Sequence, residues 1–149
     1  MARLPDIFEE YASQILSRYP EVQAKWEASR GGGRRLTIFK KDESGFDVVI
    51  DAEDYGLYPY AGEWHGPAWD LNGSCEDLCV EFMGFVRSLL CQDSKLEVFY
   101  AGSSPVKFVL TFPTEVGEES LETGLFFFNY FGKRSSKVFQ NRHLPMRYK

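Results

Sequence analysis

The sequence predicts an α+β domain built on a mainly antiparallel sheet of about five or six strands. Apolar residues recur at helical spacing in two segments and alternate at strand spacing in several others. Short turns that contain Gly, Ser or Pro separate consecutive strand segments, and such turns join antiparallel neighbours. The order of the segments therefore places an N-terminal helical segment and one central helix on one face of the sheet.

The first element is a helix that begins near Leu4, because a proline in the first turn and the acidic residues after it suit a helix N-terminus. Its apolar face continues to Tyr19, where the following proline interrupts it. We expect a second short helix, or a kinked continuation, through Val22 and Trp26. The glycines at 31–33 end this helix. Because a strand follows them, they predict a turn and not a phosphate-binding loop.

Two strands follow, around residues 36–39 and 46–51, with a hairpin turn at residues 42–45 between them. Residues 52–73 then show no periodicity and combine five Tyr and Trp side chains with several Gly and Pro residues. Segments of this length without regular structure are uncommon in compact domains and are usually functional or disordered. The aromatic content favours a compact loop packed by its own side chains.

Ser74 predicts the start of the central helix, because its hydroxyl can cap the helix and an acidic residue follows three positions later. Five apolar residues share one face of this helix: Leu78, Phe82, Phe85, Val86 and Leu89. The stripe predicts a helix that packs across the sheet. Beyond the helix, the pattern predicts strands near residues 96–100 and 106–112, an acidic loop at 113–123, an apolar strand at 125–131 and a last short strand around Val138.

The length of 149 residues fits a single α+β domain over residues 1–149. Hydrophobic residues make up 44% of the chain and aromatic residues 16%, which excludes an intrinsically disordered protein. No apolar run approaches the length of a membrane-spanning helix, and the acidic start does not resemble a secretory signal. Three cysteines do not make a disulfide scaffold, so we expect a cytoplasmic protein without membrane contact.

Charge is segregated along the chain, although the net charge is only −5. Residues 42–86 contain eleven acidic residues and no Lys or Arg, whereas residues 124–149 contain six basic residues and no acidic one. Either the basic residues Lys133, Arg134, Lys137 and Arg142 cover the acidic block, or the block is directed at a basic partner. The acidic total argues against nucleic-acid binding.

The acidic block and the aromatic loop occupy the same stretch of chain. Tyr and Trp concentrate binding energy at protein interfaces, and carboxylates steer association with basic surfaces. We therefore predict a small protein-binding or inhibitor protein of the immunity type, which presents this surface to a basic protein partner. The candidate binding residues are Asp51, Glu53, Asp54, Tyr55, Tyr58, Tyr60, Trp64 and Trp69. Alternatively, Trp64 and Trp69 fold inward as a small core beneath the loop.

A second hypothesis is a small enzyme or ligand-binding domain with a pocket under the loop between Tyr55 and Asp70. In that case His65 would act as a general base, with Glu63 or Asp70 to orient it. The sequence carries no nucleophile elbow, phosphate loop or dinucleotide fingerprint, so we expect no cofactor and prefer the non-enzymatic function.

No metal site is predicted. The acidic cluster of residues 51–54 lacks the spacing of a calcium loop, and Cys75 and Cys79 lack the second ligand pair that zinc needs. We expect these cysteines and Cys91 to pack as small hydrophobic residues. The sequence leaves open the identity of the partner and the oligomeric state, including a homodimer.

Overall fold

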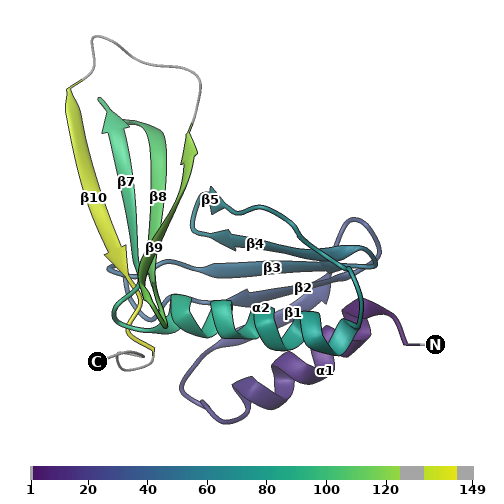
Figure 1. Cartoon of the computed structure of the whole chain (residues 1–149). Coiled ribbons are helices and arrows are strands. Elements are labelled where there is room, and N and C mark those ends of the chain that lie inside the picture. Colours follow the sequence, from purple (N-terminus) through teal and green to yellow (C-terminus); the bar gives the residue numbers. More distant parts are fainter. Residues whose placement is uncertain (1, 125–132, 144–149) are drawn as a thin grey trace.

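The computed structural model of the chain describes residues 2–124 and 133–143. In these residues two helices and two antiparallel sheets form an α+β fold (Figure 1), which confirms the predicted class with its N-terminal and central helices. The strands are divided between a six-stranded and a four-stranded sheet. The elements are α1 Leu4–Leu16, β1 Ala24–Ala28, β2 Arg34–Ile38, β3 Val48–Glu53, β4 Gly56–Ala61, β5 Trp64–His65, β6 Trp69–Asp70, α2 Cys75–Leu90, β7 Lys95–Ala101, β8 Ser104–Thr114, β9 Gly117–Gly124 and β10 Arg134–Gln140.

The six-stranded sheet has the order β1-β2-β3-β4-β5, and β6 also pairs with β4. Apolar side chains alternate along its strands, so one face is buried and both helices lie against it (Figure 1). Leu36, Ile38, Ile50 and Leu57 on this face are fully buried.

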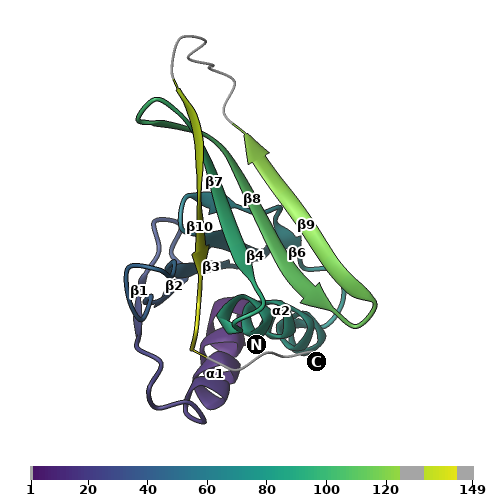
Figure 2. The same cartoon turned by 90° about the vertical axis from the view of Figure 1, so that its left-hand side faces the viewer.

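The four-stranded sheet has the order β10-β7-β8-β9 and stands across the end of the first sheet (Figure 1). Leu96, Phe108 and Leu110 form part of its buried face. β9 and β10 are its two edges, on opposite sides of the sheet (Figure 2).

The central helix α2 confirms the prediction made from its apolar stripe. The Ser74 side chain accepts a hydrogen bond of 3.0 Å from the backbone N–H of Asp77, as expected of a helix cap. Phe82, Val86 and Leu89 are fully buried, and Phe82 packs edge-on against Phe8 of α1. Leu78, the first residue of the stripe, is only half-buried. None of the helices in the described part of the chain is long and apolar enough to span a membrane.

The predicted second helix through Val22 and Trp26 is wrong. Residues 24–28 form β1, which pairs with β2 in a register that places Trp26 opposite Leu36. The five-residue strand gains a full ladder of hydrogen bonds beside β2, and this tertiary pairing outweighs its weak local preference.

The predicted loop at residues 52–73 contains β4, β5 and β6. Leu57 and Ala61 point into the core, with Tyr58 and Tyr60 on the other face, so the segment does alternate. In the sequence, Pro59 argues against a strand here, because proline has no N–H to donate to a neighbouring strand. In the fold, β6 pairs with residues 56–57 of β4 and β5 with residues 60–61, which leaves Pro59 at the gap between them.

Residues 113–123 form a hairpin instead of the predicted acidic loop. β8 and β9 meet at a tight turn, and Gly117 after the turn has a φ of 129°, a conformation that favours glycine. β9 is almost entirely exposed, so it lacks the apolar alternation that reveals a buried strand. The predicted strand at 125–131 lies outside the described residues, whereas β10 confirms the last strand around Val138.

Asn141, directly after β10, links this strand to two distant parts of the chain by side-chain hydrogen bonds. It is 1% exposed; its Oδ1 accepts a hydrogen bond from the Phe46 N–H at 3.0 Å, and its Nδ2 donates one to the Leu89 carbonyl at 3.2 Å. These bonds tie the end of the chain's last described strand to the β2–β3 connection and to the end of α2.

The packing role predicted for the cysteines is confirmed for Cys79 and Cys91, which are buried. Burial raises the pKa of the Cys79 thiol to about 11, so this thiol stays protonated at neutral pH. Cys75 is half-buried at the start of α2.

Candidate functional site

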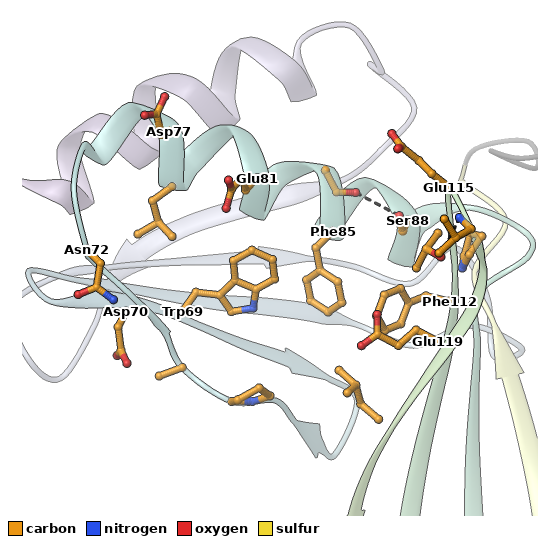
Figure 3. A pocket seen from close by; sticks show the side chains of 18 of the residues that line it. Trp69, Asp70, Asn72, Asp77, Glu81, Phe85, Ser88, Phe112, Glu115 and Glu119 are labelled. Atoms are coloured by element: carbon orange, nitrogen blue, oxygen red, sulfur yellow. Dashed lines mark hydrogen bonds between the residues drawn. The ribbon is translucent and has the colours of Figure 1, made fainter.

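A cleft of about 1180 Å³ opens between the two sheets (Figure 3). One wall is α2, the opposite wall is β6 with the loop that precedes it, and the end is closed by the β8–β9 hairpin. The cleft thus brings together residues as far as 57 positions apart in the sequence, from Trp64 to Leu121.

The floor of the cleft is aromatic. Trp69 stacks on Phe85 with ring centroids 5.6 Å apart, and Phe85 meets Phe112 edge-on at 5.1 Å (Figure 3). Trp69 is only half-buried, so part of its indole is open to a ligand, whereas Phe85 and Phe112 are largely covered. Apolar aromatic surface that stays accessible in a concave site is typical of binding sites.

Trp64 completes the wall beneath this floor. It is 1% exposed, and its ring lies so close to Gly66 that a Cβ there would come within 2.4 Å of it. Its Nε1 is buried and has no hydrogen-bond partner among the residues that the structure describes. An indole N–H usually finds a partner when it is buried, so this donor is an unsatisfied group in the cleft wall.

Five carboxylates surround the aromatic floor, and all of them are exposed: Asp70, Asp77, Glu81, Glu115 and Glu119. Within residues 2–124 and 133–143 none of the five takes part in an ion pair, and the cleft lining contains no Lys, Arg or His. A cleft lined in this way carries a concentrated negative field and favours a cationic ligand.

The predicted binding residues fall in three places. Asp51, Tyr58 and Tyr60 share the face of the larger sheet that the helices do not cover, because Asp51 lies directly opposite Tyr58. Glu53, Asp54 and Tyr55 lie at the turn between β3 and β4, where Tyr55 is 80% exposed. The third place is the cleft, where Trp64 and Trp69 belong to the lining.

Three of the predicted carboxylates have partners inside the molecule. Arg35 donates two hydrogen bonds to Asp51, at 2.6 and 2.8 Å, and these bonds raise the pKa of the Arg35 guanidinium above its usual range. Arg3 pairs with Asp54 at 2.8 Å. The Ser29 hydroxyl donates to Glu53 at 2.5 Å. The described residues contain no group of three His, Cys, Asp or Glu side chains that could hold a metal ion.

Trp64 folds inward, as the alternative prediction states, because it is buried. Trp69 is only half-buried, so this alternative holds for Trp69 only in part. No ion pair in the described part of the chain joins Lys133, Arg134, Lys137 or Arg142 to residues 42–86. Asp42, the first carboxylate of the block, does interact with this tail: hydrogen bonds from Ser44 lower its pKa, and the positive charge of Arg142 lowers it further. Arg134 and Lys137 lie on β10, which is the edge opposite β9 (Figure 2). The cleft lining includes residues of β9 and none of β10 among the described residues.

The three residues of the enzyme hypothesis lie in three neighbouring parts of the chain. His65 lies in β5, where its backbone carbonyl accepts a hydrogen bond of 2.9 Å from the Thr123 hydroxyl. Glu63 lies in the turn before β5, and Asp70 lies in β6. Within the described residues no hydrogen bond or ion pair links these three side chains, and only Asp70 lines the cleft.

Sequence reasoning missed Glu81, Glu115 and Glu119 as site residues. Glu81 follows the polar face of α2, and the two hairpin glutamates belong to a segment predicted as a loop. Phe85 lies on the apolar stripe predicted for the central helix, Phe112 lies at the end of the strand predicted near residues 106–112, and both are buried. No local signal links these segments, because the pairing of β8 with β9 and the position of the second sheet bring them together.

No protein-family model matches this chain, and comparison with curated proteins and with solved structures also finds no match.

Proposed function

We propose that this chain is a small cytoplasmic binding protein, of the inhibitor or immunity type, that holds a basic segment of a partner protein in the cleft between its two sheets. The observation that carries the proposal is the ring of five carboxylates around an aromatic floor. Among the residues that the structure describes, these carboxylates form no ion pair and no basic side chain lines the cleft.

The floor and the rim favour the same ligand chemistry. An arginine side chain can stack its guanidinium on the accessible indole of Trp69 while its N–H groups donate to a carboxylate such as Glu81 or Glu119. Acidic rims also speed the approach of basic proteins, because opposite charges steer diffusion. The same field repels phosphate groups, which favours a protein partner over a nucleic acid.

The cleft is wide and open along one side, which suits a chain segment better than an enclosed small molecule. Binding of this kind needs no catalytic residue, metal or cofactor.

Binding of a nine-residue peptide of alternating Arg and Leu tests the proposal, with a Glu–Leu peptide as the charge-reversed control. The double variant Glu81→Gln, Glu119→Gln should weaken binding about threefold to tenfold, because it removes two solvent-accessible charge contacts. The matched control, Glu10→Gln with Glu76→Gln, makes the same charge change at two exposed helix residues that lie outside both the cleft lining and β9. Equal losses in the two double variants would mean that the peptide senses only net charge, and the proposal would be wrong.

A further inference from the structure

We infer that the partner segment binds as an additional β-strand on the free edge of β9. This inference rests on the proposed function and specifies how the basic segment is held. β9 has eight residues and pairs with β8 on one side only, in a continuous register without a bulge. No described strand pairs with its other side.

The free edge of β9 borders the acidic cleft. Glu119 and Leu121 of β9 line the cleft, and their neighbours Glu118 and Ser120 point to the other face of the sheet because side chains alternate along a strand. A strand added beside β9 would continue this alternation. Every second side chain of the segment would enter the cleft above Trp69, and the others would lie beside Glu118.

The usable edge has a defined length. Near its end, Thr123 donates a hydrogen bond to the His65 carbonyl, which joins β9 to β5. The preceding residues, 117–122, stay free on that side among the described residues. An edge strand presents an unpaired N–H and C=O at every second residue, so six residues offer about three such positions to a partner backbone.

The charge of β9 selects a basic partner and disfavours a second copy of the same strand. β9 carries Glu118 and Glu119, which have no ion pair among the described residues, and Glu122, which pairs with Lys107 of β8 at 3.4 Å. It carries no Lys, Arg or Pro, whereas the edge strands β1 and β10 both carry basic residues. Pairing of β9 with another β9 would place glutamates against glutamates, which is unfavourable, while a basic strand would place opposite charges side by side. Addition of an extended peptide to a sheet edge is an established recognition mode in proteins.

The test compares the Arg–Leu peptide with an analogue N-methylated at four consecutive central residues. N-methylation removes backbone donors on both edges of the peptide but keeps every side chain and its charge. If the segment adds to β9, the analogue should bind at least about tenfold more weakly, because several backbone hydrogen bonds are lost. Hydrogen exchange should also slow at amides within residues 117–122 and stay unchanged at β10.

The outcomes separate this inference from the proposed function. If both peptides bind equally and the Glu81→Gln, Glu119→Gln variant weakens both, the cleft binds basic segments but strand addition is wrong. If neither peptide binds, both proposals fail. Slower exchange at β9, together with weak binding of the methylated analogue, is the result that supports strand addition.

Discussion

Two regions of this molecule use carboxylates from the same acidic block in different ways. Around the β3–β4 turn, Asp51 pairs with Arg35 and Asp54 with Arg3, so bases from the N-terminal part of the chain balance the charge. In the cleft, Asp70, Asp77 and Glu81 have no ion pair among the described residues and lie around an aromatic floor. A run of acidic residues in the sequence therefore does not show where unpaired negative charge gathers. The fold decides this, because it pairs some of these carboxylates with bases and leaves others without an ion pair among the described residues.

The largest expected effect is on the free energy of unfolding. It should differ sharply between two adjacent residues of α2, one in the core and one in the cleft. Phe82 is 0% exposed and packs against Phe8 and Trp69, whereas Glu81 is exposed in the cleft. Phe82→Ala should lower the free energy of unfolding by about 3–5 kcal/mol, as large core truncations do. Glu81→Gln should leave it nearly unchanged. Urea denaturation measures both, and a small effect of Phe82→Ala would contradict the packing described for α2.

A smaller effect is expected at Gly66, which lies against the cleft wall. A Cβ at this position would meet the Trp64 ring at 2.4 Å, so Gly66→Ala should displace the ring and cost about 1–3 kcal/mol. Gly124→Ala is the control, since its nearest neighbour lies 4.0 Å away. Equal melting temperatures for the two variants would show that Trp64 is not held against Gly66.

The smallest expected effect on stability tests the difference between the paired carboxylates near the β3–β4 turn and the carboxylates of the cleft. Asp51→Asn should destabilise the protein by about 1 kcal/mol, because it weakens a two-bond contact with Arg35 at a largely covered side chain. Glu119→Gln should leave stability unchanged or raise it slightly, because it reduces repulsion among the cleft carboxylates. If Glu119→Gln destabilises the fold as much as Asp51→Asn, the cleft carboxylates serve stability and the distinction between the regions is wrong.

Much of the fold could be predicted because its strongest signals are local. The cap at Ser74 and the apolar stripe of α2 are set within a few residues of each other, and both are confirmed. β1 and β9 could not be recognised, because an exposed strand is defined by its neighbour and not by its own periodicity. β4 was hidden by Pro59, whose missing N–H the fold accommodates between β5 and β6.

The candidate site was only partly predictable for the same reason. Trp64, Trp69 and Asp70 lie close together in the sequence, and all three could be named as candidate residues from the sequence alone. Glu115 and Glu119 reach the same cleft through the β8–β9 hairpin and the position of the second sheet. Such long-range pairing leaves no spacing rule in a single sequence, and so the ring of carboxylates emerges only in the folded chain.

The most direct test of the central claim follows the indole N–H signals of the three tryptophans by NMR while the Arg–Leu peptide is added. Trp64 and Trp69 line the cleft, whereas Trp26 lies on β1 and packs against Phe8. Binding in the cleft should shift the Trp69 signal most, shift the Trp64 signal as well, and leave the Trp26 signal in place. A saturating peptide that moves the Trp26 signal, or that moves none of the three, would contradict the assignment of the cleft as the binding site.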